Sequence, residues 1–276
     1  MGPVTPTEQF RALVEGGRDD PPLDVGCLLI AAHTRPANDA GTVLGDGLAL
    51  LDDLARTCPG RTIDDLRAHL FTRLGFRGNR QHYDDPRNSL LDHVLVHRVG
   101  IPITLSVVVI EVGRRLGLDL AGVGMPGHFL VGISPERFLD AFDGGRLLDP
   151  AGCRERFVEL AGPDAPWSDA LLAPVSSRAV LARVLANLRQ LFGAAQDLRG
   201  LDWVLELRLG IPGVSSRERA ERASVLAALG RYDEAASQLE ALARDKDDGA
   251  SAEDDPDGAL AAELRTRAAR LRARLN

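Results

Sequence analysis

His128 and Asp140 are the residues of this 276-residue chain whose types and positions best suit acid–base chemistry. His128 opens the apolar run "HFLV" after a Pro-Gly turn, and Asp140 lies in the next such run, "FLDAF". A polar side chain between apolar neighbours needs a hydrogen-bond partner, so we expect the two to pair across adjacent antiparallel strands. Such a couple orients the imidazole in hydrolases and acyltransferases, but it is also common as plain structural hydrogen bonding.

The choice between these two roles depends on a nucleophile. Cys27 falls within an apolar helical stretch, Cys58 precedes a Pro-Gly turn, and Cys153 follows the last predicted strand. None of the three thiols has the surroundings that would lower its pKa and direct it at the histidine, so we expect none to be catalytic. Thr104 and Ser106 are possible hydroxyl nucleophiles, although hydroxyls in the first turns of a helix usually bond to the helix backbone.

A metal or nucleotide site is not expected from the motifs. His93 and His97 lie four residues apart on one helical face, which suits a metal, but the glutamate of HExxH and an evident third ligand are missing. No glycine-rich loop with a phosphate-binding lysine precedes a helix, so we expect no cofactor. The odd number and wide spacing of the cysteines favour reduced thiols over disulfides or structural zinc.

The composition is typical of a globular protein, with 45% hydrophobic and 26% charged residues and a net charge of −7. Because no dense block of Lys or Arg is present, a nucleic-acid partner is not expected. The sequence also has no leader-like start and no run of about 18 apolar residues, so we expect a cytoplasmic protein without a membrane partner.

The elements that must position His128 and Asp140 begin with helices. Apolar residues at helical spacing predict two helices within 22–58, a third from Thr62 to Gly75 and a fourth ended by Gly100. In the loop "RQHYDDPRNS" before the fourth helix, we expect Asp85 to shape the turn and Asn88 or Ser89 to cap the helix.

A buried central helix is predicted over 103–116, with Pro102 at its first position and Gly117 at its C-cap. Short apolar runs after this helix, separated by Gly, Pro and Asp, predict a small antiparallel sheet. The front of the chain, residues 1–160, is therefore predicted to be an α+β domain, helical over 1–99 and completed by the central helix and sheet over 100–160.

Residues 161–177, rich in Pro, Ala and Ser, are predicted to form a linker, and 178–276 an all-helical domain. The segment "LAALGRYDEAASQLEAL" matches the tetratricopeptide consensus around its helix–turn–helix corner. With so few degenerate repeats, we expect the tail to dock against the front domain through Trp167 or Trp203, although Trp203 could equally fill the core of its own repeat. The acidic stretch 246–258 is predicted to be a loop.

The stretch from "GFRGNRQHYDDPRNS" through "GIPITLSVVVIEVGRRLGLDLAGVGMPGHFLV" to "LDAFDGGRLLD", followed by the helical tail, resembles the bacterial SirB family of transglutaminase-like proteins. Asp84 departs from the pattern, because relatives usually have a second tyrosine there. The resemblance implies a papain/transglutaminase-like core in which a Cys starting the central helix joins a His and an Asp on neighbouring strands. His128 and Asp140 match the family's His and Asp, whereas Gly100-Ile101-Pro102 aligns with G-x-C, so Pro102 occupies the nucleophile position.

Proline has no group that could form a thioester, so we do not expect thiol-based acyl transfer at this position. The expected function is non-catalytic or regulatory binding of a peptide or protein partner in a degenerate papain-like cleft. The alternative is an unorthodox amide-bond hydrolase or acyltransferase that uses His128 and Asp140 with a hydroxyl nucleophile, because a one-gap shift of the alignment would bring Thr104 nearer.

Overall fold

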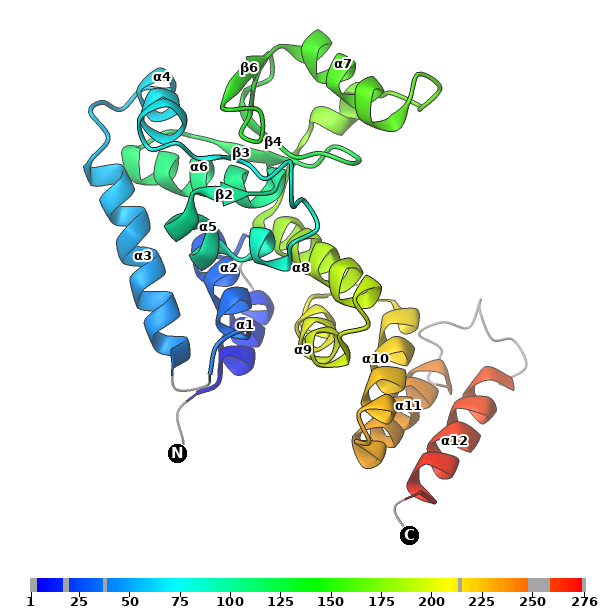
Figure 1. Ribbon diagram of the computed structural model, residues 1–276. Coiled ribbons are helices and arrows are strands. Elements are labelled where there is room, and N and C mark those ends of the chain that lie inside the picture. The colour runs from blue at the N-terminus through cyan, green and yellow to red at the C-terminus, as the bar shows by residue number, and fades with distance from the viewer. Residues whose placement is uncertain (1–3, 17–19, 37–38, 213–214, 248–258, 275–276) are drawn as a thin grey trace. The chain divides into compact units, whose positions relative to one another are not determined.

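The computed structural model describes residues 4–16, 20–36, 39–212, 215–247 and 259–274 (Figure 1). The chain divides into two compact units, residues 1–187 and 188–276. The boundary falls inside helix α8 (Ser177–Ala194). Within the described residues, no helix combines the length and the apolar character needed to cross a bilayer.

Helices begin the first unit, and side-chain caps fix where two of them start. Thr5 and Glu8 form a capping box at α1, and Thr62 and Asp65 form one at α4, which confirms the expected helix start at Thr62. A single turn of π-helix, η2 (Ala68–Arg73), continues α4. The helices predicted within 22–58 are present, whereas α1 was not predicted. The bounds are α1 (Pro6–Glu15), α2 (Leu23–Ala32), α3 (Ala40–Arg56) and α4 (Ile63–Arg67).

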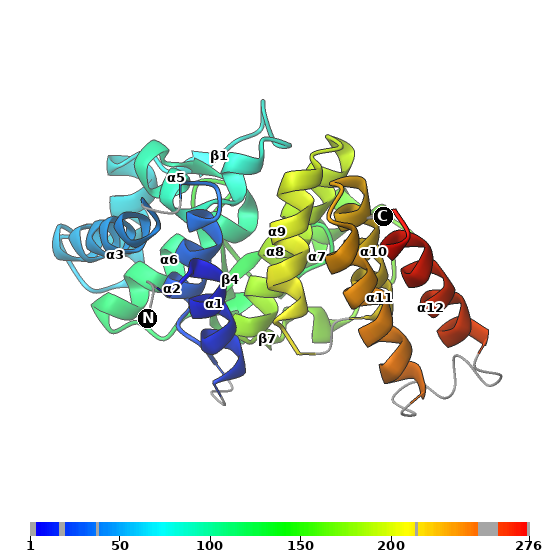
Figure 2. The same ribbon diagram turned by 90° about the horizontal axis from the view of Figure 1, so that it is seen from below.

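Helix α6 (Pro102–Leu116) is the buried centre of this unit, as expected. Pro102 occupies its first turn, and Gly117 ends it at a φ of 81°, a left-handed conformation that glycine adopts without steric cost. Helices α2, α3 and α5 (Leu91–His97) pack around it (Figure 2). Helix α5 is capped at its C-terminus by Arg98, which adopts the left-handed conformation, so the predicted stop at Gly100 is wrong by two residues.

A five-stranded antiparallel sheet follows, with strand order β6-β5-β4-β3-β7, and confirms the predicted small sheet. Helices α6 and α7 (Pro150–Ala161) lie on opposite faces of it (Figure 1). Helix α7 was not predicted. The strands are β3 (Ala121–Val123), β4 (Leu130–Ser134), β5 (Arg137–Asp140), β6 (Arg146–Leu148) and β7 (Pro174–Val175); outside the sheet, β1 (Arg77–Gly78) pairs in parallel with β2 (Val99–Gly100).

The prediction that residues 161–177 form a linker is wrong. This stretch contains the 3₁₀ helix η4 (Asp169–Leu172) and strand β7, which pairs with β3. Trp167 packs on Phe157 of α7 with ring centroids 5.4 Å apart, and Leu172 joins the same apolar cluster. These apolar side chains are removed from water by packing against the sheet and α7, so the stretch belongs to the α+β unit.

The tail is all-helical, as expected. Its described core joins α10, α11 and α12 through small and branched apolar residues such as Ala235, Leu239 and Ala268. The Trp203 ring lies edge-on to Phe192 with centroids 5.8 Å apart, so Trp203 contributes to packing within the tail's own helices. The acidic stretch predicted at 246–258 lies mostly outside the described residues. The remaining helices are α9 (Leu198–Leu209), α10 (Ser216–Ala228), α11 (Tyr232–Asp247) and α12 (Ala259–Arg272).

Candidate functional site

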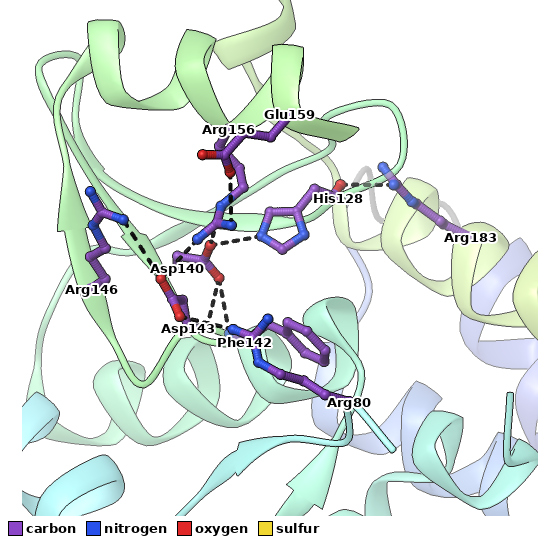
Figure 3. A network of polar contacts seen from close by, with 9 residues as sticks. All are labelled: Arg80, His128, Asp140, Phe142, Asp143, Arg146, Arg156, Glu159 and Arg183. Carbon is purple, nitrogen blue, oxygen red and sulfur yellow. Dashed lines mark hydrogen bonds and ion pairs between the residues drawn. The ribbon is translucent and has the colours of Figure 1, made fainter. Parts of the chain in front are cut away.

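The structure brings His128 and Asp140 into direct contact. Strands β4 and β5 are antiparallel neighbours; Asp140 ends β5, and His128 lies two residues before β4 begins. Nε2 of the imidazole lies 2.9 Å from Oδ2 of Asp140, and both side chains are buried (Figure 3). Within the described residues Nδ1 has no hydrogen-bond partner. The couple therefore has a fixed imidazole with one nitrogen committed to the carboxylate.

The Asp140 carboxylate is held as an anion. Its Oδ1 accepts hydrogen bonds from the backbone N–H groups of Phe142 and Asp143, at 3.0 and 3.1 Å. Burial alone raises the pKa of this carboxyl group, but the hydrogen bond from His128, the Asp143 N–H and the charge of Arg156 together bring the pKa below its ordinary value. An ionised Asp140 accepts the Nε2–H, which leaves Nδ1 with the lone pair in the neutral ring.

Arg156, on α7, completes this network and was not anticipated from the sequence. Its Nε lies 3.3 Å from Oδ2 of Asp140, and Nη2 lies 2.8 Å from Oδ2 of Asp143. Figure 3 shows the imidazole and this guanidinium both beside the Asp140 carboxylate. Asp143 also pairs with Arg80 at 2.9 Å. The buried charge of Asp140 is thus balanced by a cation that shares the oxygen Oδ2 with the histidine.

The turn that carries His128 is held from helix α8. Nη2 of Arg183 donates to the carbonyl oxygens of Met125 and His128, at 2.7 and 2.8 Å (Figure 3). On the other side, the Phe142 ring packs edge-on against the imidazole and against Tyr83, with centroids 6.3 and 5.8 Å away. Backbone and ring of His128 are both positioned by contacts that do not involve Asp140.

The start of α6 has a different character. Pro102 is buried, and the wholly buried Thr104 hydroxyl donates at 2.6 Å to the carbonyl of Asn88. The Thr104 oxygen also lies 3.3 Å from the Ile101 N–H, which it accepts. Ser106 is also fully buried, and its Oγ has no partner within the described residues. Among the described residues, no hydrogen bond or ring contact joins this turn to His128, so the arrangement that the family resemblance implies, with the histidine beside the start of the central helix, stays a prediction.

Asn88 is a structural residue, but not in the predicted way. Its Nδ2 donates to the carbonyls of His82 and Tyr83, at 2.7 and 3.2 Å, and its Oδ1 accepts from Asn79 at 3.0 Å. Helix α5 has no side-chain cap, so the expected capping by Asn88 or Ser89 is wrong. The Asn88 side-chain amide instead donates to loop carbonyls that come near it only in the folded chain.

The turn before Pro86 is formed as predicted. Asp85 accepts the Arg87 backbone N–H at 2.9 Å and thereby caps the 3₁₀ helix η3 (Pro86–Ser89). The Arg87 guanidinium donates three further hydrogen bonds to the same carboxylate, two from Nε and one from Nη2. Asp85 and Asn88 therefore shape the loop that lies against the start of α6.

Neither buried cysteine is suited to nucleophilic attack. Burial, with Glu111 and Asp24 nearby, raises the pKa of the Cys27 thiol far above its ordinary value. Burial, reinforced by Asp149 and Asp140, raises the pKa of Cys153 to about 12. Both thiols therefore stay protonated at neutral pH. Cys58 is half-buried and lies in the turn before α4.

The two histidines at helical spacing do meet, but without further ligands. The His93 and His97 rings lie with centroids 4.1 Å apart on α5. Burial, and then the neighbouring His97 and Arg87, lower the pKa of His93. Within the described ranges, no cluster of three or more His, Cys, Asp or Glu side chains is arranged to hold a metal ion.

Comparisons with known proteins place this geometry in context. A family model described as the transglutaminase-like superfamily matches residues 47–186. A UPF0162 protein of Pseudomonas aeruginosa is 35% identical over 204 residues, which is 69% of this chain and 73% of that protein. A UPF0162 protein of Xylella fastidiosa is 45% identical over 130 residues, and the match spans about half of each chain, 45% of this one and 46% of the relative. Human F-box only protein 21 is 31% identical over 142 residues, which is 48% of this chain but 22% of that protein.

Proposed function

This chain belongs to the transglutaminase-like superfamily, and we propose that it is a non-catalytic member that binds a peptide or protein partner in a degenerate papain-like cleft. The observation that carries the proposal is the contrast between an intact His128–Asp140 couple and a helix start that offers no thiol. We also propose the finer assignment to the SirB-like group and the tetratricopeptide character of the tail, which rest on the sequence motifs.

The start of α6 supports loss of thiol chemistry. Pro102 lies where the resemblance expects the cysteine, and its ring carries no ionisable group. The Thr104 hydroxyl is already committed to the Asn88 carbonyl, so using it as a nucleophile would break a buried hydrogen bond. The protonated, buried thiols of Cys27 and Cys153 offer no replacement.

The His128–Asp140 couple supports the proposed binding role, because its contacts hold the imidazole in place. His128, Asp140 and Arg156 come from three elements and are linked by short polar contacts. Breaking such a buried network is costly, so it persists for structural reasons even where no bond is cleaved. A peptide lying beside it would meet the ring of Phe142 and Nδ1 of His128, which has no hydrogen-bond partner in the described part of the chain.

A hydrolase or acyltransferase with a hydroxyl nucleophile is the second candidate, and Ser106 is the one observation in its favour. The Ser106 Oγ is buried without a hydrogen-bond partner among the described residues, which is unusual for a hydroxyl. Its side chain has no solvent exposure, however, so a substrate could reach it only if α6 moved.

Covalent labelling separates the two candidates. The full chain, incubated with a fluorophosphonate and with a thiol-directed acyl probe, should give no labelling that depends on His128. The matched variant His128→Gln keeps a donor toward Asp140 but cannot accept a proton. A further variant, Pro102→Cys, should gain a probe-reactive thiol whose rate falls when His128→Gln is added.

The readout is mass spectrometry of the labelled peptide. Labelling of the unmodified chain at Thr104 or Ser106 that disappears in His128→Gln would establish the hydrolase or acyltransferase and reject the non-catalytic proposal. A Pro102→Cys thiol whose rate is indifferent to His128 would show that Pro102 does not occupy the nucleophile position.

A further inference from the structure

A separate cavity of about 640 Å³ opens on the face of the sheet that α7 partly covers. Its floor is apolar and includes Val123, Phe138 and Leu172, and prolines line its walls. None of its lining residues belongs to the His128, Asp140 and Arg156 network. The volume lies within the roughly 300–1,000 Å³ of ligand-binding pockets.

The cavity exists because small residues and a strand irregularity leave the sheet uncovered there. Ala121 and Gly132 face each other across β3 and β4, and a Cβ on Gly132 would lie 3.2 Å from Val123. Strand alternation would turn Ile133 away from Gly132 and Ser134, yet all three line the cavity. The register shift between Gly132 and Ser134 explains this, since a bulge re-aims side chains.

The rim of the cavity is acidic. Asp119 precedes β3, Glu136 lies in the turn between β4 and β5, and Asp169 begins η4. No Lys or Arg lines the cavity. Within the described residues no salt bridge involves Asp119 or Glu136, whereas Asp169 accepts the indole N–H of Trp167 at 3.0 Å. Three carboxylates from three segments thus surround one apolar floor, and none of the lining residues is a cation.

We propose that this cavity binds a partner's peptide segment in which an apolar side chain is flanked by Lys or Arg residues. The apolar side chain would enter the floor at Phe138 and Leu172, and the flanking cations would reach the rim carboxylates. A ligand with a single compact cation could pair with the carboxylate of only one of the three segments. The peptide matches both the floor and the rim.

The test uses the full chain and a fluorescently labelled pentapeptide of alternating arginine and leucine, with binding measured by fluorescence anisotropy. The rim variant Asp119→Asn, Glu136→Gln, Asp169→Asn should weaken binding by about tenfold, because each exposed ion pair contributes modestly. The matched control, Glu15→Gln, Glu155→Gln, Asp164→Asn, removes the same charge at exposed positions outside the cavity and should leave binding unchanged.

The apolar part of the proposal is tested separately. Ala173→Trp places a large ring at the exposed edge of the cavity and should reduce binding while leaving the thermal melt unchanged. A peptide with glutamate in place of arginine should not bind. Absence of saturable binding to the unmodified chain, or equal weakening by the rim and control variants, overturns the proposal. Tighter binding of dodecylammonium than of the peptide also overturns it.

This inference is independent of the role proposed for the His128 couple. The rim variants leave His128 untouched, and the labelling experiment leaves the cavity untouched. Either proposal can therefore fail while the other stands.

Discussion

At the end of β5, the Asp140 carboxylate receives hydrogen bonds from the His128 imidazole and from two backbone N–H groups, and a guanidinium lies beside it. At the start of α6, by contrast, Pro102 is followed by one hydroxyl that bonds to backbone, that of Thr104, and one that has no partner among the described residues, that of Ser106. Both regions are buried. Under the proposed non-catalytic role, the difference would mean that mutual contacts keep the His128–Asp140 couple in place, whereas no comparable contact keeps a nucleophile at the start of α6.

The largest expected effect tests whether the Asp140 network is as interdependent as its contacts suggest. Asp140→Ala leaves the Arg156 guanidinium and the His128 Nε2–H without their buried acceptor. Breaking one side of a buried charge network typically costs about 3–5 kcal/mol, so the urea midpoint of the full chain should fall sharply.

Asp143→Ala is the matched control for that variant. The Asp143 side chain is about one-third exposed, and its backbone N–H still reaches Asp140 in the variant. Its loss should cost about 0–1 kcal/mol. A cost for Asp140→Ala no larger than this would contradict the interdependence of the network.

A smaller effect is expected at the start of α6. Thr104→Val keeps the shape of the side chain but leaves the buried Asn88 carbonyl without its donor, at a cost of about 1–3 kcal/mol. Ser106→Ala removes a hydroxyl that has no hydrogen-bond partner among the described residues. The free energy of unfolding should therefore stay within about 0.5 kcal/mol of that of the unmodified chain, or rise. Urea unfolding of both variants measures the two effects. Equal losses of unfolding free energy would contradict the prediction that only the Thr104 hydroxyl stabilises the fold.

The smallest effect concerns pH and sharpens the same comparison. Asp140 has a lowered pKa in the folded chain, so it binds its proton less readily there than in the unfolded chain, where the pKa is about 3.9. Its contribution to stability is therefore present above about pH 4 and is lost as the pH falls through the folded-state pKa. The difference in unfolding free energy between the unmodified chain and Asp140→Asn should be largest near neutral pH and shrink on acidification. A difference that stayed constant would mean that the carboxylate charge contributes nothing.

The sequence was sufficient to predict the His128–Asp140 pair because two apolar runs bounded by turns specify neighbouring strands. Pairing of these strands then brings the two side chains together. The sequence also predicted α6, because Pro102 and Gly117 mark its ends. The role of Arg156 was not predicted, because the helix that carries it, α7, was not predicted. Only Cys153 and Phe157 of α7 are buried, so the apolar stripe is too thin to indicate a helix, although Asp149-Pro150 is a start signal.

The errors arose where tertiary contacts override local preference. Asn88 precedes a helix and would suit a cap, but the fold brings the carbonyls of His82 and Tyr83 to its amide. Arg98 adopts the left-handed conformation two residues before a glycine, which no local pattern announces. The stretch 161–177 has the composition of a linker, and only the uncovered sheet gives its apolar side chains a place to pack.

The hydrogen bond between His128 and Asp140 joins residues that are near in sequence. His128 and Asp140 are 12 residues apart, and Thr104 and Asn88 are 16 apart, whereas the bond between Ser177 and Asp20 spans 157. Loop-closure entropy grows with loop length, by about 0.6 kcal/mol for each doubling, and local contacts form faster than distant ones. The His128–Asp140 contact can therefore form during folding before α8 brings Arg183 to the turn that carries His128.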